Sequence, residues 1–289
     1  MKHPHLEQTL FVMLKDYKAH VEERAEKGIP PLPLNAEQVA SLVELIKEPP
    51  SGEEDFILDL LTNRTPAGVD PAAYVKAAFL TDIAKGKANS PLIDKKHATE
   101  LLGTMLGGYN VESLIELLED EEVGSIAADG LSGTLLMFNA KHDVIELSKK
   151  NENAKRVVDA WANAEWFTNK PELPEVIKAI VFKVDGEINT DDLSPAQDAP
   201  SRPDIPLHAL AMLKKTFKDP IDTINKLEES GLPVVFVGDV VGTGSSRKSA
   251  TNSLLWHIGE DIPFIPNKRQ AGICTVSYTH LTLPTKAKV

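Results

Sequence analysis

Apolar residues recur at helical spacing through the first half of the chain. In five segments they occupy positions i, i+3, i+4 and i+7, which form one face of an amphipathic helix. The pattern predicts helices at residues 10–17, 39–46, 98–105, 111–118 and 154–161. Typical helix-start residues are Asn35, Asp70, Asp94 and Asn110. We therefore expect residues 1–166 to form an all-α domain.

Short helices with brief connections bury their apolar faces against one another, either as a solenoid of helix pairs or as a bundle. No exact repeat is visible in the sequence, so the pattern alone favours a plain bundle nearly as strongly as a HEAT-like solenoid. The acidic runs Glu53–Asp55 and Glu116–Glu122 are interpreted as solvated helix surface.

The pattern changes to short strand-like runs in the second half. Residues 167–174 interrupt the last helix and are predicted to be a linker. Ile180–Val184 and Pro233–Val237 are rich in β-branched and aromatic residues, which are typical of strands, and each run leads into a polar turn. We expect a mixed α/β domain over residues 175–273, which makes the chain multidomain.

The second of these turns, GDVVGTGSSRKSATNS at residues 238–253, leads from a strand into a helix. Backbone N–H groups and the positive end of a helix dipole favour an anion there, and Arg247 adds a two-pronged donor for carboxylate or phosphate. A Walker phosphate loop is excluded because Ser245 stands where lysine is required, and a dinucleotide turn because Arg247 replaces its third glycine. The alternative is that Ser245 and Ser246 only cap a helix and Arg247 is a surface charge.

The first turn, INTDDLSPAQDAPSR at residues 188–202, is by itself an ordinary Asx-rich turn. Together with the Gly-Ser-Ser-Arg turn, and with SRPDIPLHALAMLKK at 201–215 and PNKR at 266–269, it resembles the swivel domain of the aconitase family. The resemblance is to the bacterial aconitate hydratase B branch. It implies a HEAT-like helical solenoid followed by an α/β swivel domain, which would be incomplete here.

The resemblance also implies roles for individual residues. Arg202 and Arg247 would bind carboxylates of a tricarboxylate substrate (citrate, isocitrate or cis-aconitate), and Ser245 would be the base that removes a carbon-bound proton. Ser246 would donate or accept a hydrogen bond beside it. The residues that would line the site and orient these groups are Thr190, Asp191 and Ser194.

The implied activity is that of a hydro-lyase of the tricarboxylic acid cycle, aconitate hydratase, with 2-methylisocitrate as a further substrate to consider. Its cofactor would be a [4Fe–4S] cluster, which is held by several cysteine thiolates. The chain has one cysteine, Cys274, and its eight histidines are scattered. We therefore expect the cluster ligands to lie outside this chain and no metal to be bound within it.

Residues 274–289 do not resemble the family, and we interpret them as an atypical tail, a foreign reading joined to a truncated frame. The chain would then be a fragment, inactive without the missing cluster-bearing domains. The resemblance also implies homodimer formation through the helical domain. The alternative from another class is a non-catalytic binding or assembly module with an anion-binding turn.

Composition argues against several other classes of protein: RNA-binding, secreted, membrane and disulfide-rich proteins. The formal net charge is −12, and there is no basic stripe with interleaved aromatic residues, so RNA contact is only a minor alternative. Residues 1–5 lack the apolar core of a signal peptide, and no apolar run reaches membrane-spanning length. A single cysteine argues against a disulfide framework. The expected location is the cytoplasm.

Overall fold

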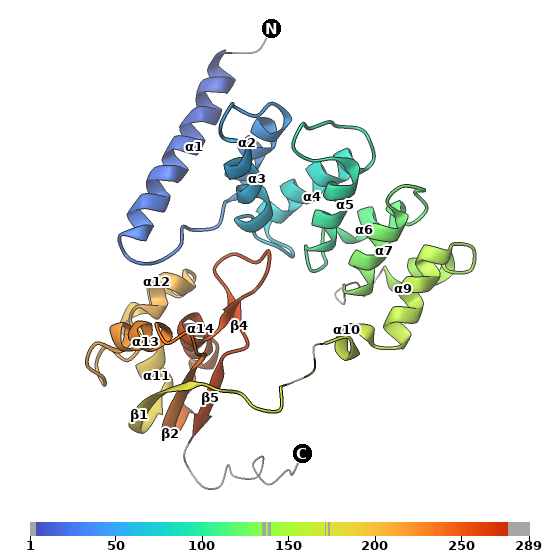
Figure 1. The fold of residues 1–289 in the computed structure, drawn as a ribbon. Coiled ribbons are helices and arrows are strands. Elements are labelled where there is room, and N and C mark those ends of the chain that lie inside the picture. The colour runs from blue at the N-terminus through green and yellow to red at the C-terminus, as the bar shows by residue number, and fades with distance from the viewer. Residues whose placement is uncertain (1–3, 135–136, 138–139, 171, 173, 277–289) are drawn as a thin grey trace. The chain divides into compact units, whose positions relative to one another are not determined.

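The computed structural model describes residues 4–134, 137, 140–170, 172 and 174–276. The chain divides into two compact units (Figure 1). The helical unit comprises the described residues of Met1–Glu22, Pro33–Glu172 and Pro263–Pro266. The α/β unit comprises those of Glu23–Leu32, Leu173–Ile262 and Asn267–Val289. The predicted combination of a helical part and a mixed α/β part is confirmed.

Ten helices precede the first strand in the part of the chain that the structure describes. They are α1 (Pro4–Ala25), α2 (Ala36–Lys47), α3 (Glu54–Asn63), α4 (Pro71–Ala84), α5 (Lys95–Gly103), α6 (Val111–Leu117), α7 (Gly124–Ser132), α8 (Lys141–Leu147), α9 (Glu152–Ala162) and α10 (Glu165–Thr168). The five predicted helices fall on α1, α2, α5, α6 and α9.

Three of the four predicted start residues cap their helices with their side chains. Asn35 forms a capping box with Gln38, Asp70 accepts a hydrogen bond from Ala72 N, and Asp94 accepts one from His97 N. Asn110 stands at the predicted position but makes no capping bond. Its side-chain amide instead donates to the Leu102 carbonyl at 2.7 Å, which ties the start of α6 to α5.

The helices of this unit pack on one another in a row. α2 packs on α3 and α4, α4 on α5, α5 on α7, and α7 on α6 and α9 (Figure 1). One continuous cluster of buried side chains runs through all of these contacts, from Leu14 in α1 to Val157 in α9. The helices therefore cover one another's apolar faces, as the amphipathic spacing requires in a bundle as well as in a solenoid.

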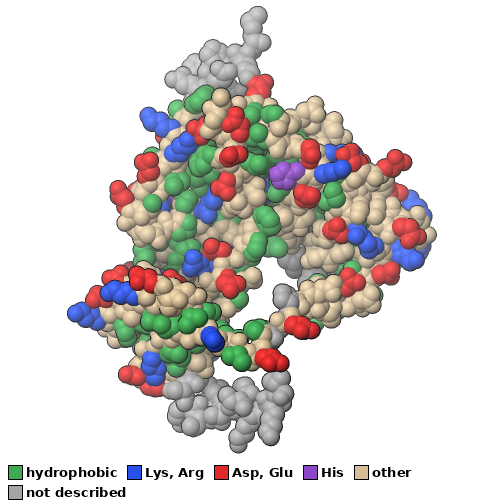
Figure 2. Space-filling view, in the orientation of Figure 1, with side chains coloured by type: hydrophobic (Ala, Val, Ile, Leu, Met, Phe, Trp, Pro, Cys, Tyr) green, Lys and Arg blue, Asp and Glu red, His purple; other side chains and the backbone are tan. Residues whose placement is uncertain are grey.

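The acidic runs lie on the surface of the helical unit and carry ion pairs. Lys18 contacts Glu53 at 2.6 Å, Lys95 contacts Asp120 at 2.7 Å, and Lys85 contacts Glu116. Basic and acidic side chains are intermixed over the face drawn in Figure 2. Lysines thus pair with part of these acidic runs at the surface.

The α/β unit contains short helices and five strands within the described residues. In chain order these are β1 (Ile180–Asn189), α11 (Thr190–Leu193), a 3₁₀ helix (Ala196–Ser201), α12 (Ile205–Ala209), α13 (Pro220–Glu228), β2 (Val234–Thr243), α14 (Arg247–Ile258), β3 (Glu260–Asp261), β4 (Arg269–Gln270) and β5 (Ile273–Val276). The main sheet has the order β1-β2-β5 with both pairs parallel, and β3 pairs antiparallel with β4.

The core of this unit lies between the main sheet and the helices packed on it. Phe182 in β1 and Phe236 in β2 are almost completely buried, with ring centroids 5.8 Å apart. Leu254 of α14 and Ile224 of α13 belong to the same cluster. α14 is thereby fixed against β2, and its first residue follows closely on the end of that strand.

Two details differ from the sequence-based expectation. The strand predicted at Pro233–Val237 continues to Thr243, so the glycine-rich turn is only the short connection between β2 and α14. Cys274–Val276 pair with β2 as part of β5, although we placed them in the atypical tail. The rest of that tail, residues 277–289, lies outside the described residues. None of the described helices combines the length and apolarity needed to cross a membrane.

Candidate anion-binding site at the ends of two parallel strands

The two polar turns singled out in the sequence lie at the same edge of the main sheet. Because β1 and β2 are parallel, their carboxyl ends meet, and Asn189 pairs with Thr243 in the register. α11 follows β1 directly, and α14 follows β2 after three residues. Segments more than fifty positions apart in the sequence are therefore neighbours at this edge.

The first turn is held by its own side chains. Asn189 Oδ1 accepts hydrogen bonds from the N–H groups of Asp191 and Asp192 at 2.7 and 3.0 Å, and Asp192 Oδ2 accepts one from Asn189 N. This capping box folds residues 190–193 into α11. It buries Thr190 and Ser194 and leaves Asp191 exposed.

The second turn is fitted against the first at Gly244. Its φ of +109° is a conformation that residues with a side chain rarely adopt. A Cβ added there would lie 2.5 Å from Thr190 Oγ1. The same Thr190 oxygen accepts a hydrogen bond from Ser246 N at 3.3 Å. Glycine is thus required at 244 by both the backbone conformation and the close approach of the first turn.

Arg202 reaches both turns. Its Nη2 donates to the Ser194 carbonyl at 3.3 Å and to Ser246 Oγ at 3.4 Å. Its Nε is buried and has no hydrogen-bond partner among the described residues, which is unusual for a buried donor. The contacts that Arg202 does make are long, so this guanidinium keeps hydrogen-bonding capacity that the protein does not use.

Ser245 and Arg247 lie on the exposed side of the same turn. The Arg247 Nε donates to the Gly244 carbonyl at 3.4 Å, which keeps the base of the side chain at the turn. Among the described residues nothing hydrogen-bonds to the Ser245 hydroxyl, and Ser246 makes no side-chain cap on α14. The alternative in which the Ser246 hydroxyl serves to cap the helix is therefore wrong.

The structure brings together most of the predicted site residues. Arg202, Ser246, Thr190 and Ser194 are joined by the contacts above, and Ser245 and Arg247 flank Ser246 in the chain. Asp191 belongs to the same turn, but in the described part of the chain its carboxylate contacts none of the other predicted residues. Two cationic side chains and the N-terminus of a 12-residue helix thus lie at one turn, an arrangement that favours an anion.

An open cavity of about 360 Å³ lies beside this turn. Thr190, Gly242 and Arg247 contribute to its wall, and the remaining lining is mostly apolar, with Leu193 and Leu254 among its residues. The cavity lining therefore combines polar groups with apolar side chains. It has room for a small organic acid.

One residue behind the site, His208, was missed by the sequence analysis. His208 of α12 is buried, and its Nε2 lies 2.7 Å from Ser194 Oγ. Its Nδ1 lies 2.8 Å from Ser201 Oγ and 3.1 Å from the Asp198 carbonyl oxygen. Burial lowers the pKa of His208, and the nearby Arg202 lowers it further, against the opposing effect of the Asp198 carbonyl bond. No spacing rule connects Ser194 with a histidine 14 positions later, so the sequence offered no signal.

The residues present do not fit an iron–sulfur cluster. Among the described residues there is no group of three His, Cys, Asp or Glu side chains that could hold a metal ion. Cys274 is the single cysteine of the chain, whereas cluster ligation takes several thiolates.

Comparison with known families assigns both units. The Aconitate B N-terminal domain family matches residues 16–167, and the Aconitate hydratase 2 N-terminus family matches residues 179–279. These two matches define the chain as the N-terminal part of an aconitase-type protein. The chain belongs to the aconitate hydratase B family.

The curated relatives agree. The chain is 62% identical to aconitate hydratase B of Pseudomonas aeruginosa over 273 residues, which are 91% of this chain and 31% of the relative. It is 60% identical to aconitate hydratase B of Escherichia coli over 91% of this chain and 32% of that protein. Identity to the Helicobacter pylori protein is 54%, over 90% of this chain and 31% of the relative. The chain thus spans about a third of the length of the relatives it matches.

Proposed function

We propose that this chain is the part of an aconitate hydratase that binds the substrate carboxylates and carries the base. The complete enzyme would interconvert citrate and isocitrate through cis-aconitate. The observation that carries the proposal is the contact of Arg202 with Ser246, since it joins one candidate carboxylate-binding arginine to the turn that bears Ser245 and Arg247.

The chemistry assigned to Ser245 follows from its surroundings. In the dehydration of citrate a C–H bond breaks, its proton passes to the Ser245 oxygen, and its electron pair forms the C=C bond as the C–OH bond breaks and the hydroxyl leaves as hydroxide. The cluster of the complete enzyme would supply the Lewis acid that accepts this hydroxide. Ser245 can accept this proton only as the alkoxide, which needs positive charge and N–H donors nearby. Arg202, Arg247 and the start of α14 supply both. Addition of water in the other orientation then gives isocitrate.

The two arginines have a second task. A tricarboxylate carries about three negative charges, and the chain has a net charge of −12, so the local cations must overcome a repulsive background. Planar guanidinium groups can bind a carboxylate through two parallel hydrogen bonds, whereas a lysine cannot. The long contacts of Arg202 Nη2, at 3.3 and 3.4 Å, support this role, because a substrate oxygen would use donor capacity that the folded chain uses only weakly.

Under the proposal, the iron–sulfur cluster of the complete enzyme takes its ligands from the remaining two thirds of the family's length, which lie outside this chain. The helical unit is assigned to a HEAT-like solenoid that mediates association of two copies. Val69, Tyr74, Leu106 and Tyr109 support this, since these large side chains of the helical unit are 41–76% exposed.

Calorimetric titration of citrate into the purified chain tests the carboxylate-binding role. We expect binding that weakens about tenfold or more in Arg202→Lys and Arg247→Lys, because loss of a bidentate pair costs more than about 1.4 kcal/mol. Arg156→Lys, on an exposed arginine paired with Asp129 in the helical unit, is the matched control and should bind as the original chain does.

The base is tested by adding a fragment that carries the cluster-bearing domains of a relative. Dehydration of citrate, and separately of 2-methylisocitrate, should appear in the mixture and be lost in Ser245→Ala while citrate binding persists. A chain that forms oligomers but binds no tricarboxylate would instead support the non-catalytic assembly module.

A further inference from the structure

The Arg202 guanidinium is held by a chain of hydrogen bonds that begins at a buried histidine. Ser194 is the middle link, because its hydroxyl contacts His208 Nε2 at 2.7 Å while its carbonyl accepts from Arg202 Nη2 at 3.3 Å. Neither Ser194 nor His208 is exposed by more than 2%. The contact therefore cannot be replaced by bulk water without opening the core.

The partners of His208 determine which ring nitrogen carries the proton. The Asp198 carbonyl oxygen lies 3.1 Å from Nδ1, and a carbonyl can only accept, so Nδ1 is the protonated nitrogen. Ser201 Oγ donates to the same carbonyl at 2.7 Å and is therefore free to accept from Nδ1 as well. Nε2 keeps its lone pair. The Ser194 hydroxyl must then donate to Nε2.

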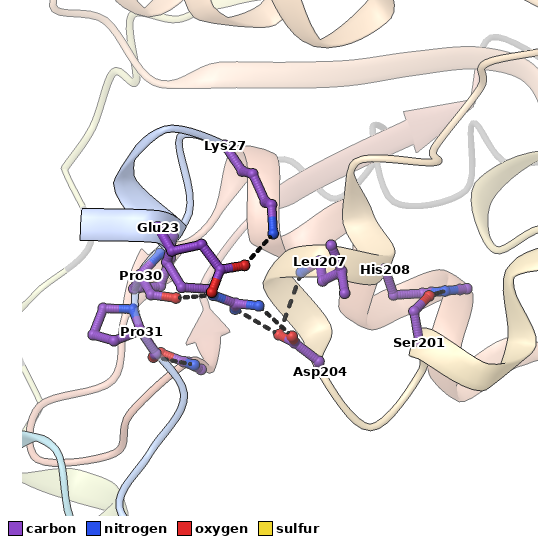
Figure 3. Close-up of polar contacts among 10 residues, drawn as sticks. Glu23, Lys27, Pro30, Pro31, Ser201, Asp204, Leu207 and His208 are labelled. Carbon is purple, nitrogen blue, oxygen red and sulfur yellow. Dashed lines mark hydrogen bonds and ion pairs between the residues drawn. The ribbon is translucent and has the colours of Figure 1, made fainter. Parts of the chain in front are cut away.

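The position of Ser194 explains why this bond matters. Ser194 follows α11 with φ −144° and ψ 79°, a conformation outside the helix, which directs its carbonyl to Arg202. The hydroxyl bond to His208 holds the residue in that conformation. Figure 3 shows His208 extending from the short helix α12 toward Ser201, while Asp204 at the start of that helix faces the other way, toward Pro30. Asp204 anchors the start of α12, so the His208 imidazole projects from a helix that is held in place.

We propose that His208 is a positioning residue for Arg202: through the Ser194 hydroxyl it fixes the carbonyl that aims the guanidinium at Ser246 and at a carboxylate bound beside it. This inference rests on the proposed function, in which Arg202 binds a substrate carboxylate. His208 itself does not touch the substrate. It holds the Arg202 side chain in one of the several orientations that this side chain could otherwise adopt.

Two substitutions of His208 each keep one hydrogen bond of the imidazole and remove the other. His208→Gln places an amide oxygen near the position of Nε2 and keeps an acceptor for the Ser194 hydroxyl. His208→Asn places an amide N–H near the position of Nδ1 and keeps the bond to Asp198, but loses Ser194. Ser194→Ala removes the same bond from the other side while leaving the carbonyl in place.

His257 provides a matched control. It is the other buried histidine of the α/β unit within the described residues, it is 6% exposed, and its Nε2 donates to the Ala209 carbonyl at 2.9 Å. It lies near the end of α14, ten positions from Arg247. His257→Asn should lower the stability of the same core without changing the orientation of Arg202.

The experiment is a titration of citrate into each variant, with thermal unfolding of the same samples. We expect His208→Asn and Ser194→Ala to weaken citrate binding about tenfold, which corresponds to about 1.4 kcal/mol, and His208→Gln to retain most of the affinity. His257→Asn should unfold at a lower temperature and bind citrate unchanged. Unchanged affinity in His208→Asn, in a background where Arg202→Lys loses binding, would overturn the inference.

A second measurement does not depend on citrate. The Nε–Hε resonance of Arg202 in an NMR spectrum should shift or broaden in His208→Asn and stay in place in His257→Asn and His208→Gln. If the original chain bound no citrate, the proposed function would fail, yet this resonance would still decide whether His208 positions Arg202. An Arg202 resonance identical in all three variants would reject the positioning role.

Discussion

Arg24 and Asp204 are joined by two hydrogen bonds, from Nη2 to Oδ1 at 2.9 Å and from Nη1 to Oδ2 at 2.5 Å. Both side chains are largely buried, with 5% and 15% of their surface exposed. The Arg24 Nε also donates to the Pro30 carbonyl at 2.8 Å, and Asp204 accepts from Leu207 N at the start of α12. The segment Glu23–Leu32 is thereby tied to the helix that carries His208.

Arg24→Ala tests this connection. It leaves a buried carboxylate without its cation, so we expect the free energy of unfolding to fall by about 3 kcal/mol. Urea denaturation measures the change. Lys27→Ala is the control, since Lys27 pairs with Glu23 in an exposed i,i+4 contact and should cost no more than about 0.5 kcal/mol. Equal effects of the two substitutions would contradict a structural role for the Arg24–Asp204 pair.

Gly244→Ala should damage the site more than any other glycine replacement in its turn. The new Cβ would meet Thr190 Oγ1 at 2.5 Å, and the backbone would be strained at φ +109°. We expect destabilisation of about 2 kcal/mol or more and loss of citrate binding by calorimetry.

Gly231→Ala separates the two causes. Gly231 also has a positive φ, +71°, but an added Cβ would meet nothing within 4 Å. It should therefore show the strain alone and leave citrate binding intact. If Gly231→Ala and Gly244→Ala were equally harmful to binding, the close approach of the two turns would not explain the requirement for glycine.

The elements that the sequence predicts well are those that depend on local rules. Helix spacing and the caps at Asn35, Asp70 and Asp94 involve residues within one turn of each other, so the sequence alone suffices. Asn110 shows the limit, because its amide bonds to Leu102 of another helix instead of capping its own. The choice between these two partners depends on tertiary packing.

The candidate site divides in the same way. Glycine and serine in the second turn are visible in the sequence as a turn pattern, although the close approach of Thr190 that also requires glycine at 244 is not. The contact of Arg202 with Ser246 joins residues 44 positions apart, and it depends on the parallel pairing of β1 and β2. His208 could not be recognised, since its role comes from the position of α12 and from a tautomer set by the Asp198 carbonyl. Local patterns therefore find the turns but not the residues that support them.

Lys76 in α4 is a buried cation of the helical unit. It is 2% exposed, its Nζ donates to the Thr62 carbonyl at 3.3 Å, and burial lowers its pKa to about 8. At pH 7 the folded chain must bury this charge, which costs about 3 kcal/mol for a shift of this size. Lys76→Met removes the charge at similar length, so we expect a gain of about 2 kcal/mol after the lost hydrogen bond is counted.

The stability gained by Lys76→Met should depend on pH in a defined direction. Between pH 8 and about 10.5 the unfolded chain holds a proton on Lys76 that the folded chain has lost, so the stability of the original chain rises with pH in that range. The advantage of Lys76→Met in urea denaturation should then shrink from pH 8 to pH 10.5. An advantage that stayed constant over this range would mean that the buried charge is not its cause.

The buried histidines of the α/β unit should make the chain sensitive to acid. Burial lowers the pKa of His208 and of His257, with the Ala209 carbonyl bond opposing the shift in His257. Below about pH 6.5 the unfolded chain binds protons on these residues before the folded chain does. The free energy of unfolding therefore falls as the pH drops below 6.5, by at most about 1.4 kcal/mol per pH unit for each residue.

Glutamine does not titrate and can keep one bond at each position. In urea denaturation between pH 6.5 and 5, His257→Gln should have a shallower slope than the original chain, and the double variant with His208→Gln a shallower one still. An unchanged slope in the double variant would show that other groups govern acid unfolding.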